Sequence, residues 1–276
     1  MTSEPGPRFD IAIIGRGVRD VAHLTLESLE ILKSCKRGFV SAPTQEEVDI
    51  FRESVLKQFK TIESLPPLVN LQVAYRKDRS RTDNYADAGE AVLDAAKSHC
   101  PVAYLTPGNP VIWDAITQRI LEGARVRGLR TKIVPGISFI DTMLVDLEQE
   151  MAPGFQIYDT SWVVGAEMQP NARTACILVQ IGLFCKNYLV IDTMPQATAL
   201  EALRDYLLKF YPSDHLIVLV RSRTEGASQP FVRPLTLGKL ATVPGDCQLG
   251  TSLYIPPLLE GALAEEFAAR MSKLEL

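Results

Sequence analysis

FDIAIIGRGVRD, residues 9–20, is the stretch from which the fold class follows. It begins with a short apolar run, Phe9 to Ile14, that ends at Gly15. Such a run before a glycine is typical of a buried parallel strand that enters a tight turn. We expect a helix to follow and to end at Gly38. Its apolar stripe would consist of His23, Leu24, Leu26, Leu29, Ile31 and Leu32.

The alternation of strand and helix continues to about residue 150. Further strands are predicted at 39–40, 71–75, 102–105 and 132–134, and helices at 45–59, 83–98 and 111–127. Strands that alternate with helices require crossover connections, which are right-handed. The first half of the chain is therefore predicted to form a mostly parallel sheet with helices on both faces.

The pattern changes near residues 151–154. Beyond them strands are more frequent, at 156–158, 176–180, 216–221 and 252–255, with helices at 195–210 and 258–273. A chain of 276 residues suits two compact domains. We predict a disordered N-terminus at 1–8, an α/β domain at 9–150, and a second α/β domain at 151–276 with a mixed sheet and a terminal helix.

Composition restricts the partners. A net charge of −4 provides no broad positive field, which argues against nucleic acid as a partner. The five cysteines are scattered without a Cys-x-x-Cys pair, and we interpret them as reduced thiols of a cytoplasmic protein. No histidine has a partner at metal-ligand spacing, so no metal is predicted. No apolar stretch approaches the ~20 residues that cross a bilayer, so no membrane is predicted as a partner.

Three loops with glycine follow predicted strands of the first domain. They are Gly15–Asp20, Thr106–Pro110 and Pro135–Ser138. In open parallel sheets, ligands bind beyond the carboxyl ends of the strands, where glycine lets the backbone approach them. The first loop suggests a dinucleotide site, but it lacks the third glycine, and no acidic residue ends the second strand. Each glycine alone could also simply form a turn.

The segment Asp78–Tyr85 places a cation and a phenol four residues apart. If a helix begins near Thr82 or Asp83, Arg81 and Tyr85 project to nearly the same face. A guanidinium beside a partly buried phenol favours the phenolate and is expected to lower the pKa of Tyr85. The alternative is that both side chains lie on a solvated helix start.

Together, the three loops resemble those of the tetrapyrrole methylase superfamily of S-adenosylmethionine-dependent methyltransferases. The resemblance implies two α/β domains with the cofactor in the cleft between them. Gly15 and Gly17 would form a loop on the substrate side, and Trp113 would pack against the adenosine or simply in the core. The cofactor-binding residues implied are Pro107, Gly108, Asn109, Ile112, Ser138 and Phe139 on the first domain, and Gln180, Thr251 and Ser252 on the second.

Within the superfamily the chain is most similar to the borosin peptide-backbone N-methyltransferases. Ser80-Arg81 with Tyr85, Tyr75 upstream, and the segment Leu253–Pro257 carry this similarity, whereas Pro107 replaces a tyrosine of that family. An amide nitrogen is a poor nucleophile because its lone pair is delocalised. The resemblance implies that Tyr85 takes or polarises the amide proton while Arg81 and Tyr75 stabilise the developing oxygen charge.

The predicted partners follow from the same resemblance. Residues 258–276 look like an amphipathic helix without an apolar core peptide, so we expect a separate precursor peptide in trans. A homodimer is expected because borosin enzymes are homodimers.

Three other functions remain open. A tetrapyrrole methylase would use basic groups for carboxylates, available at Arg16, Arg19, Arg76, Lys77, Arg79 and Arg81. An RNA methylase is disfavoured by the negative charge. A catalytically silent module would bind the cofactor or a peptide without turnover.

Overall fold

The computed structural model describes residues 9–76, 78–186, 195–224, 229–258, 265–266 and 269–272. The predicted disordered N-terminus and most of the predicted helix 258–273 lie outside the described residues. The chain divides into two compact units. The first is formed mainly by residues up to Thr142, and the second begins with Met143–Lys186 and includes most of the C-terminal part of the chain.

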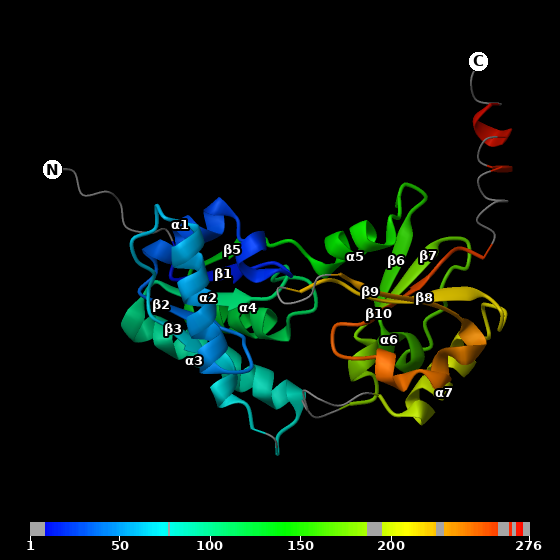
Figure 1. Ribbon diagram of the computed structural model, residues 1–276. Coiled ribbons are helices and arrows are strands. Elements are labelled where there is room, and N and C mark those ends of the chain that lie inside the picture. Colours follow the sequence, from blue (N-terminus) through cyan, green and yellow to red (C-terminus); the bar gives the residue numbers. More distant parts are fainter. Residues whose placement is uncertain are drawn as a thin grey trace. The chain divides into compact units, whose positions relative to one another are not determined.

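The first unit contains a parallel sheet of five strands, as predicted (Figure 1). Its strands are β1 (Ile11–Gly15), β2 (Arg37–Val40), β3 (Leu68–Asn70), β4 (Val102–Thr106) and β5 (Thr131–Val134), in the order β3-β2-β4-β1-β5. The register pairs Ile11 with both Val102 and Thr131. The carboxyl ends of β4, β1 and β5 therefore lie side by side at the same end of the sheet, which we call its carboxyl edge.

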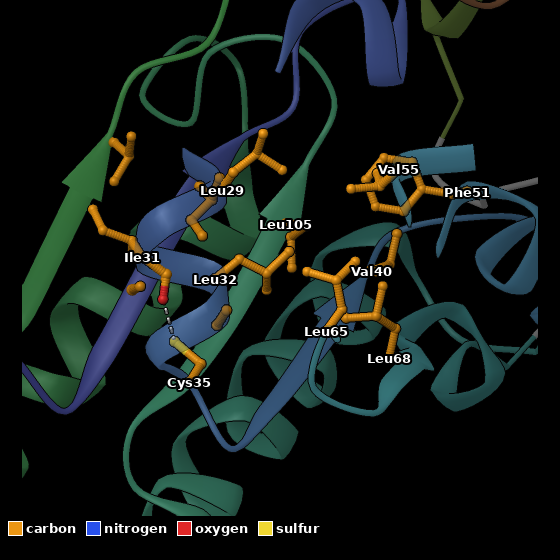
Figure 2. Packing of buried hydrophobic residues seen from close by; sticks show 14 of the residues in the cluster. Leu29, Ile31, Leu32, Cys35, Val40, Phe51, Val55, Leu65, Leu68 and Leu105 are labelled. Carbon is orange, nitrogen blue, oxygen red and sulfur yellow. Dashed lines mark hydrogen bonds between the residues drawn. The ribbon is translucent and has the colours of Figure 1, made fainter. Parts of the chain in front are cut away.

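Helices cover both faces of this sheet and form a hydrophobic core on each face. The side chains of β1 alternate between these two cores. Ala12 and Ile14 pack with α1 (Leu26–Ser34) and α2 (Gln45–Gln58), in the core that Figure 2 shows around Leu32 and Leu105. Ile11 and Ile13 pack on the other side with α3 (Arg81–His99) and α4 (Ala115–Arg127). A 3-10 helix, η1 (Asp20–His23), precedes α1, and α5 (Phe139–Leu147) follows β5.

Three predicted boundaries differ from the structure. The predicted strand at 71–75 is wrong, because the Asn70 side chain accepts a hydrogen bond from Gln72 N–H and starts the 3-10 helix η2 (Leu71–Ala74). Gly38 does not end the first helix but lies in β2. The helix predicted from residue 111 begins only at Ala115, because Asp114 caps it.

The second unit contains a mixed sheet, as predicted. Strand β6 (Phe155–Asp159) is parallel to β7 (Ala175–Val179), and the other pairs are antiparallel, in the order β6-β7-β10-β8-β9. The other strands are β8 (Leu216–Arg221), β9 (Phe231–Thr236) and β10 (Ser252–Ile255). The helices are α6 (Thr160–Gly165), α7 (Ala197–Leu207), η3 (Ile181–Leu183), η4 (Leu237–Thr242) and η5 (Pro244–Asp246).

Strand β9 was not predicted, because it contains Pro234. Proline cannot donate to a ladder and is tolerated only at an edge, and β9 is an edge strand of its sheet. Within the described part of the chain, no helix combines the length and apolar character that crossing a membrane would require.

Candidate functional site

Three loops meet at the carboxyl edge of the parallel sheet, as the strand order requires. Gly108 N–H donates to the carbonyl oxygen of Gly17 over 2.9 Å, and Gly17 N–H donates back to Gly108 over 3.3 Å. A Cβ atom on Gly15 would lie 2.5 Å from the carbonyl oxygen of Gly108 and 2.5 Å from the amide nitrogen of Gly136. Position 15 therefore requires glycine, because the neighbouring loops leave no room for a side chain.

The second loop, after β4, has an unusual backbone. Gly108 has a φ of +70° with open space beside its Cα, and Trp113 has a φ of +53°. A bulky residue in the left-handed region costs on the order of 1–3 kcal/mol and is a common feature of functional sites. The Asn109 side-chain oxygen accepts from Val111 N–H over 3.1 Å, and Ile112 N–H donates to the carbonyl oxygen of Asn109 over 3.1 Å.

Apolar side chains line the same loops. The Trp113 indole contacts the Phe139 ring edge to face, with 6.0 Å between centroids. Val111, Trp113 and Ile137 remain 52%, 39% and 39% exposed, and Pro107 is exposed as well. Ser138 is buried, and its polar groups are engaged at the start of α5. Its hydroxyl accepts a hydrogen bond from Ile140 N–H, and its own N–H donates to the Asp141 carboxylate. The loops thus expose aromatic and aliphatic surface beside backbone polar groups.

Arg81, Tyr85 and Tyr75 gather into one group, which we call the phenol cluster. Ser80, not Thr82 or Asp83, caps α3 by accepting from Asp83 N–H over 3.1 Å. This makes Arg81 the first residue of the helix and places Tyr85 one turn later, on the same face as predicted. The rings of Tyr75 and Tyr85 meet edge to face, with 6.1 Å between centroids.

A buried asparagine, missed in the sequence, holds the segment before α3. The Asn84 side-chain oxygen accepts from Arg76 N–H over 2.8 Å, and its Nδ2 donates to the carbonyl oxygen of Arg76 over 2.9 Å. Asn84 is 1% exposed. Because Tyr75 immediately precedes Arg76, these two bonds fix where the chain delivers the Tyr75 ring.

The expected low pKa of Tyr85 is wrong. Burial raises the pKa of Tyr85 and outweighs the lowering effect of Arg81, and Asp114 raises the pKa further. Burial is also the largest cause that raises the pKa of Tyr75, followed by Tyr85 and Asp114, while a hydrogen bond with Ser41 opposes them. Both phenols are therefore protonated at neutral pH and retain a hydroxyl proton that can be donated.

Most basic residues near the first loop and α3 already have partners. Arg16 is buried, pairs with Asp20 and donates to the carbonyl oxygen of Ser41 over 2.8 Å. Arg76 pairs with Asp78 at 2.9 Å, and Arg79 pairs with Asp87. Lys77 lies outside the described residues.

Gln180, Thr251 and Ser252 lie together in the second unit. Gln180 follows β7 with a φ of +64°, and Ser252 begins β10, which pairs with β7 through Leu253 and Leu178. Thr251 is fully buried, accepts from Arg221 over 3.2 Å and donates to the carbonyl oxygen of Asp246 over 3.1 Å. These three residues form a group of their own, and their predicted role in closing the cofactor site stays a prediction.

No metal centre emerges from the part of the chain that the structure describes, where no three His, Cys, Asp or Glu side chains are placed to hold an ion. The absence of a metal in the reaction stays a prediction.

Comparisons with known proteins bear on this site. Residues 10–239 match the family of tetrapyrrole (corrin/porphyrin) methylases. The methyltransferase/ribosomally synthesized type I borosin cyclic peptide precursor of Serendipita vermifera subsp. bescii is 24% identical, over 98% of this chain and 64% of the relative. A type II borosin counterpart from Phlebiopsis gigantea is 26% identical, over 95% of this chain and 45% of the relative. The chain spans less than two thirds of the length of either relative.

The fold has solved counterparts. The crystal structure of uroporphyrin-III C-methyl transferase from Thermus thermophilus complexed with S-adenyl homocysteine superposes with a TM-score of 0.55 at 14% identity. The alignment covers 91% of this chain and 98% of that chain. The predicted fold class is therefore confirmed.

Proposed function

Because the chain belongs to the tetrapyrrole (corrin/porphyrin) methylase family, we propose that it is an S-adenosylmethionine-dependent methyltransferase that acts on backbone amides of a peptide. The family assignment and the S-adenyl homocysteine bound to a protein of similar fold support the cofactor. The borosin relatives, whose names join a methyltransferase to a peptide precursor, support the acceptor. A separate precursor in trans and a homodimer stay predictions.

The chemistry of the loops fits the cofactor. The space beside Gly108, the exposed face of Trp113 and the Phe139 ring suit an adenosine, which needs apolar contact on its faces. No described residue is hydrogen-bonded to the Asn109 Nδ2 group, which leaves two donors for polar atoms of the ligand. When bound, S-adenosylmethionine supplies an electrophilic methyl group.

The phenol cluster is the single observation that carries the acceptor. When an amide nitrogen is methylated, the N–CH3 bond forms as the S–CH3 bond of the sulfonium breaks. The amide proton passes to solvent water, and as it leaves, negative charge develops on the carbonyl oxygen. Two protonated phenols beside a guanidinium are suited to stabilise that oxygen, and such donors typically contribute 10²–10³ in rate. The raised pKa of Tyr85 revises its predicted role from base to donor at neutral pH, since burial keeps the phenol protonated.

Tetrapyrrole methylation is the second candidate, because the family is named for it. A tetrapyrrole carries several carboxylates and requires several available cations. Arg16, Arg76 and Arg79 are already paired with acidic residues of this chain. This observation favours the peptide.

The test compares acceptors directly. The purified chain is incubated with isotopically labelled S-adenosylmethionine and either a synthetic Val/Ile-rich peptide library or uroporphyrinogen. We expect label on peptide backbone amides, located by tandem mass spectrometry. Tyr85→Phe should lower turnover about 10²-fold or more with unchanged binding of S-adenosylhomocysteine. Rapid transfer to uroporphyrinogen with none to peptide would refute the acceptor, and bound cofactor without any turnover would support a silent module.

A further inference from the structure

A histidine holds the backbone of the first glycine loop. The sequence placed His23 on the apolar stripe of the first helix, but that helix begins only at Leu26, and His23 is the last residue of η1. Its Nδ1 accepts hydrogen bonds from two successive backbone groups, Val18 N–H over 3.2 Å and Arg19 N–H over 3.2 Å. His23 therefore supplies one acceptor for two amide groups that precede η1.

The conformation of the loop places its backbone directly against this imidazole. Gly17 and Asp20 adopt positive φ values of +76° and +37°, which bend the chain sharply between β1 and η1. A Cβ atom on Gly17 would overlap the Cβ of His23 and would lie 3.0 Å from its Cγ and 3.2 Å from its Nδ1. Only glycine at position 17 leaves space for the ring of His23.

The loop that His23 holds is hydrogen-bonded to the predicted cofactor loop after β4. Gly17 and Gly108 exchange two backbone hydrogen bonds, of 2.9 Å and 3.3 Å, and Arg16 N–H donates to the carbonyl oxygen of Thr106 over 2.9 Å. The open space beside Gly108 lies on this second loop. A displacement of residues 17–19 would therefore also displace the backbone against which the cofactor is proposed to lie.

We propose that His23 is a positioning residue of the cofactor site, whose Nδ1 fixes the first loop and, through the bridge between Gly17 and Gly108, the loop that receives the adenosine. The inference rests on the proposed function for the identity of the ligand. Without this acceptor, the N–H groups of Val18 and Arg19 lose their partner, and the first loop gains alternative conformations. Binding of the cofactor must then order the loop again, and the cost of that ordering lowers the affinity.

The experiment compares His23→Leu with His23→Asn. Both new side chains branch at Cγ and are similar in size, but asparagine carries an acceptor oxygen at the position of Nδ1, where leucine carries a methyl group. Affinity for S-adenosylhomocysteine is measured by calorimetry. We expect it to fall about tenfold in His23→Leu, as two lost hydrogen bonds would cause, and to stay within about threefold of the parent in His23→Asn. His23→Gln, whose oxygen lies one bond further from the backbone, should not restore the affinity.

Hydrogen exchange at the amides of Val18 and Arg19, followed by NMR, is a second readout that needs no ligand. Exchange should be faster in His23→Leu than in His23→Asn, because only the asparagine variant keeps an acceptor for these amides. Equal exchange in the two variants would overturn the inference, and so would faster exchange in His23→Leu with the cofactor affinity of the parent. A parent that fails to bind S-adenosylhomocysteine would refute the proposed function and the inference with it. Binding by the parent with equal affinities in the two variants would overturn the inference alone.

His215→Leu is the matched control. His215 precedes β8 in the second unit, and its Nε2 donates a hydrogen bond to the carbonyl oxygen of Pro256 over 3.0 Å. The replacement therefore also removes a histidine and a hydrogen bond to the backbone, but at a place that does not contact the first loop. We expect the parent's affinity for S-adenosylhomocysteine in this variant. A loss equal to that in His23→Leu would show that general destabilisation weakens binding, and would overturn the inference.

Discussion

Replacing Gly15 by alanine tests whether the three loops meet as described. The added Cβ would lie 2.5 Å from Gly108 O, 2.5 Å from Gly136 N and 2.8 Å from Gly136 Cα. Unstrained contacts of this kind are ~3.5 Å or longer, so the overlaps are about 0.7 to 1 Å. All three atoms are backbone, so no side-chain rotation relieves the overlap and the loops must separate. Overpacking costs ~1–3 kcal/mol, and we expect the upper part of that range.

Two measurements check this expectation. Urea unfolding should show a free energy of unfolding lower by about 2–3 kcal/mol, and calorimetry should show S-adenosylhomocysteine binding weakened about tenfold or more, which is ~1.4 kcal/mol. Gly165→Ala is the control, because that glycine ends α6 and a Cβ there meets no atom within 4 Å. A Gly15→Ala protein with the stability and affinity of the parent would refute the described approach of the loops.

Two further predictions concern the first unit. Asn84→Ala removes both hydrogen bonds to Arg76, so the free energy of unfolding in urea should fall by about 1–3 kcal/mol. Because Tyr75 then loses its position, peptide turnover should fall by a larger factor than cofactor affinity. An equal loss of turnover and of cofactor affinity would contradict this reasoning. Hydrogen bonds from Arg130 hold the pKa of Asp10 well below its ordinary value. That stabilisation is present above the unfolded pKa of ~3.9 and is lost as pH falls toward the folded pKa. Asp10→Asn should therefore be less stable than the parent at neutral pH, with a difference that shrinks in acid; a difference independent of pH would show that the ion pair is not its source.

Local pattern was sufficient for much of the fold. The apolar run before Gly15 and the regular alternation after it predicted the parallel sheet, because burial on both faces demands continuous apolar strands. The same reasoning placed the loops at 15–20, 106–110 and 135–138 beyond strand ends. It failed for β9, whose Pro234 argues against a strand unless the strand is known to lie at an edge, and for 71–75, where a single side-chain bond from Asn70 replaces strand by 3-10 helix.

The features of the candidate site also divide into those that the sequence determined and those that depended on the tertiary structure. The sequence by itself determined that Arg81 and Tyr85 share a helix face, since a spacing of four residues is a property of the helix alone. Only the tertiary structure decided the direction in which the pKa of Tyr85 shifts, because burial, which outweighs Arg81, comes from elements distant in sequence. Desolvation depends on everything that surrounds a group, and no spacing along the chain records it.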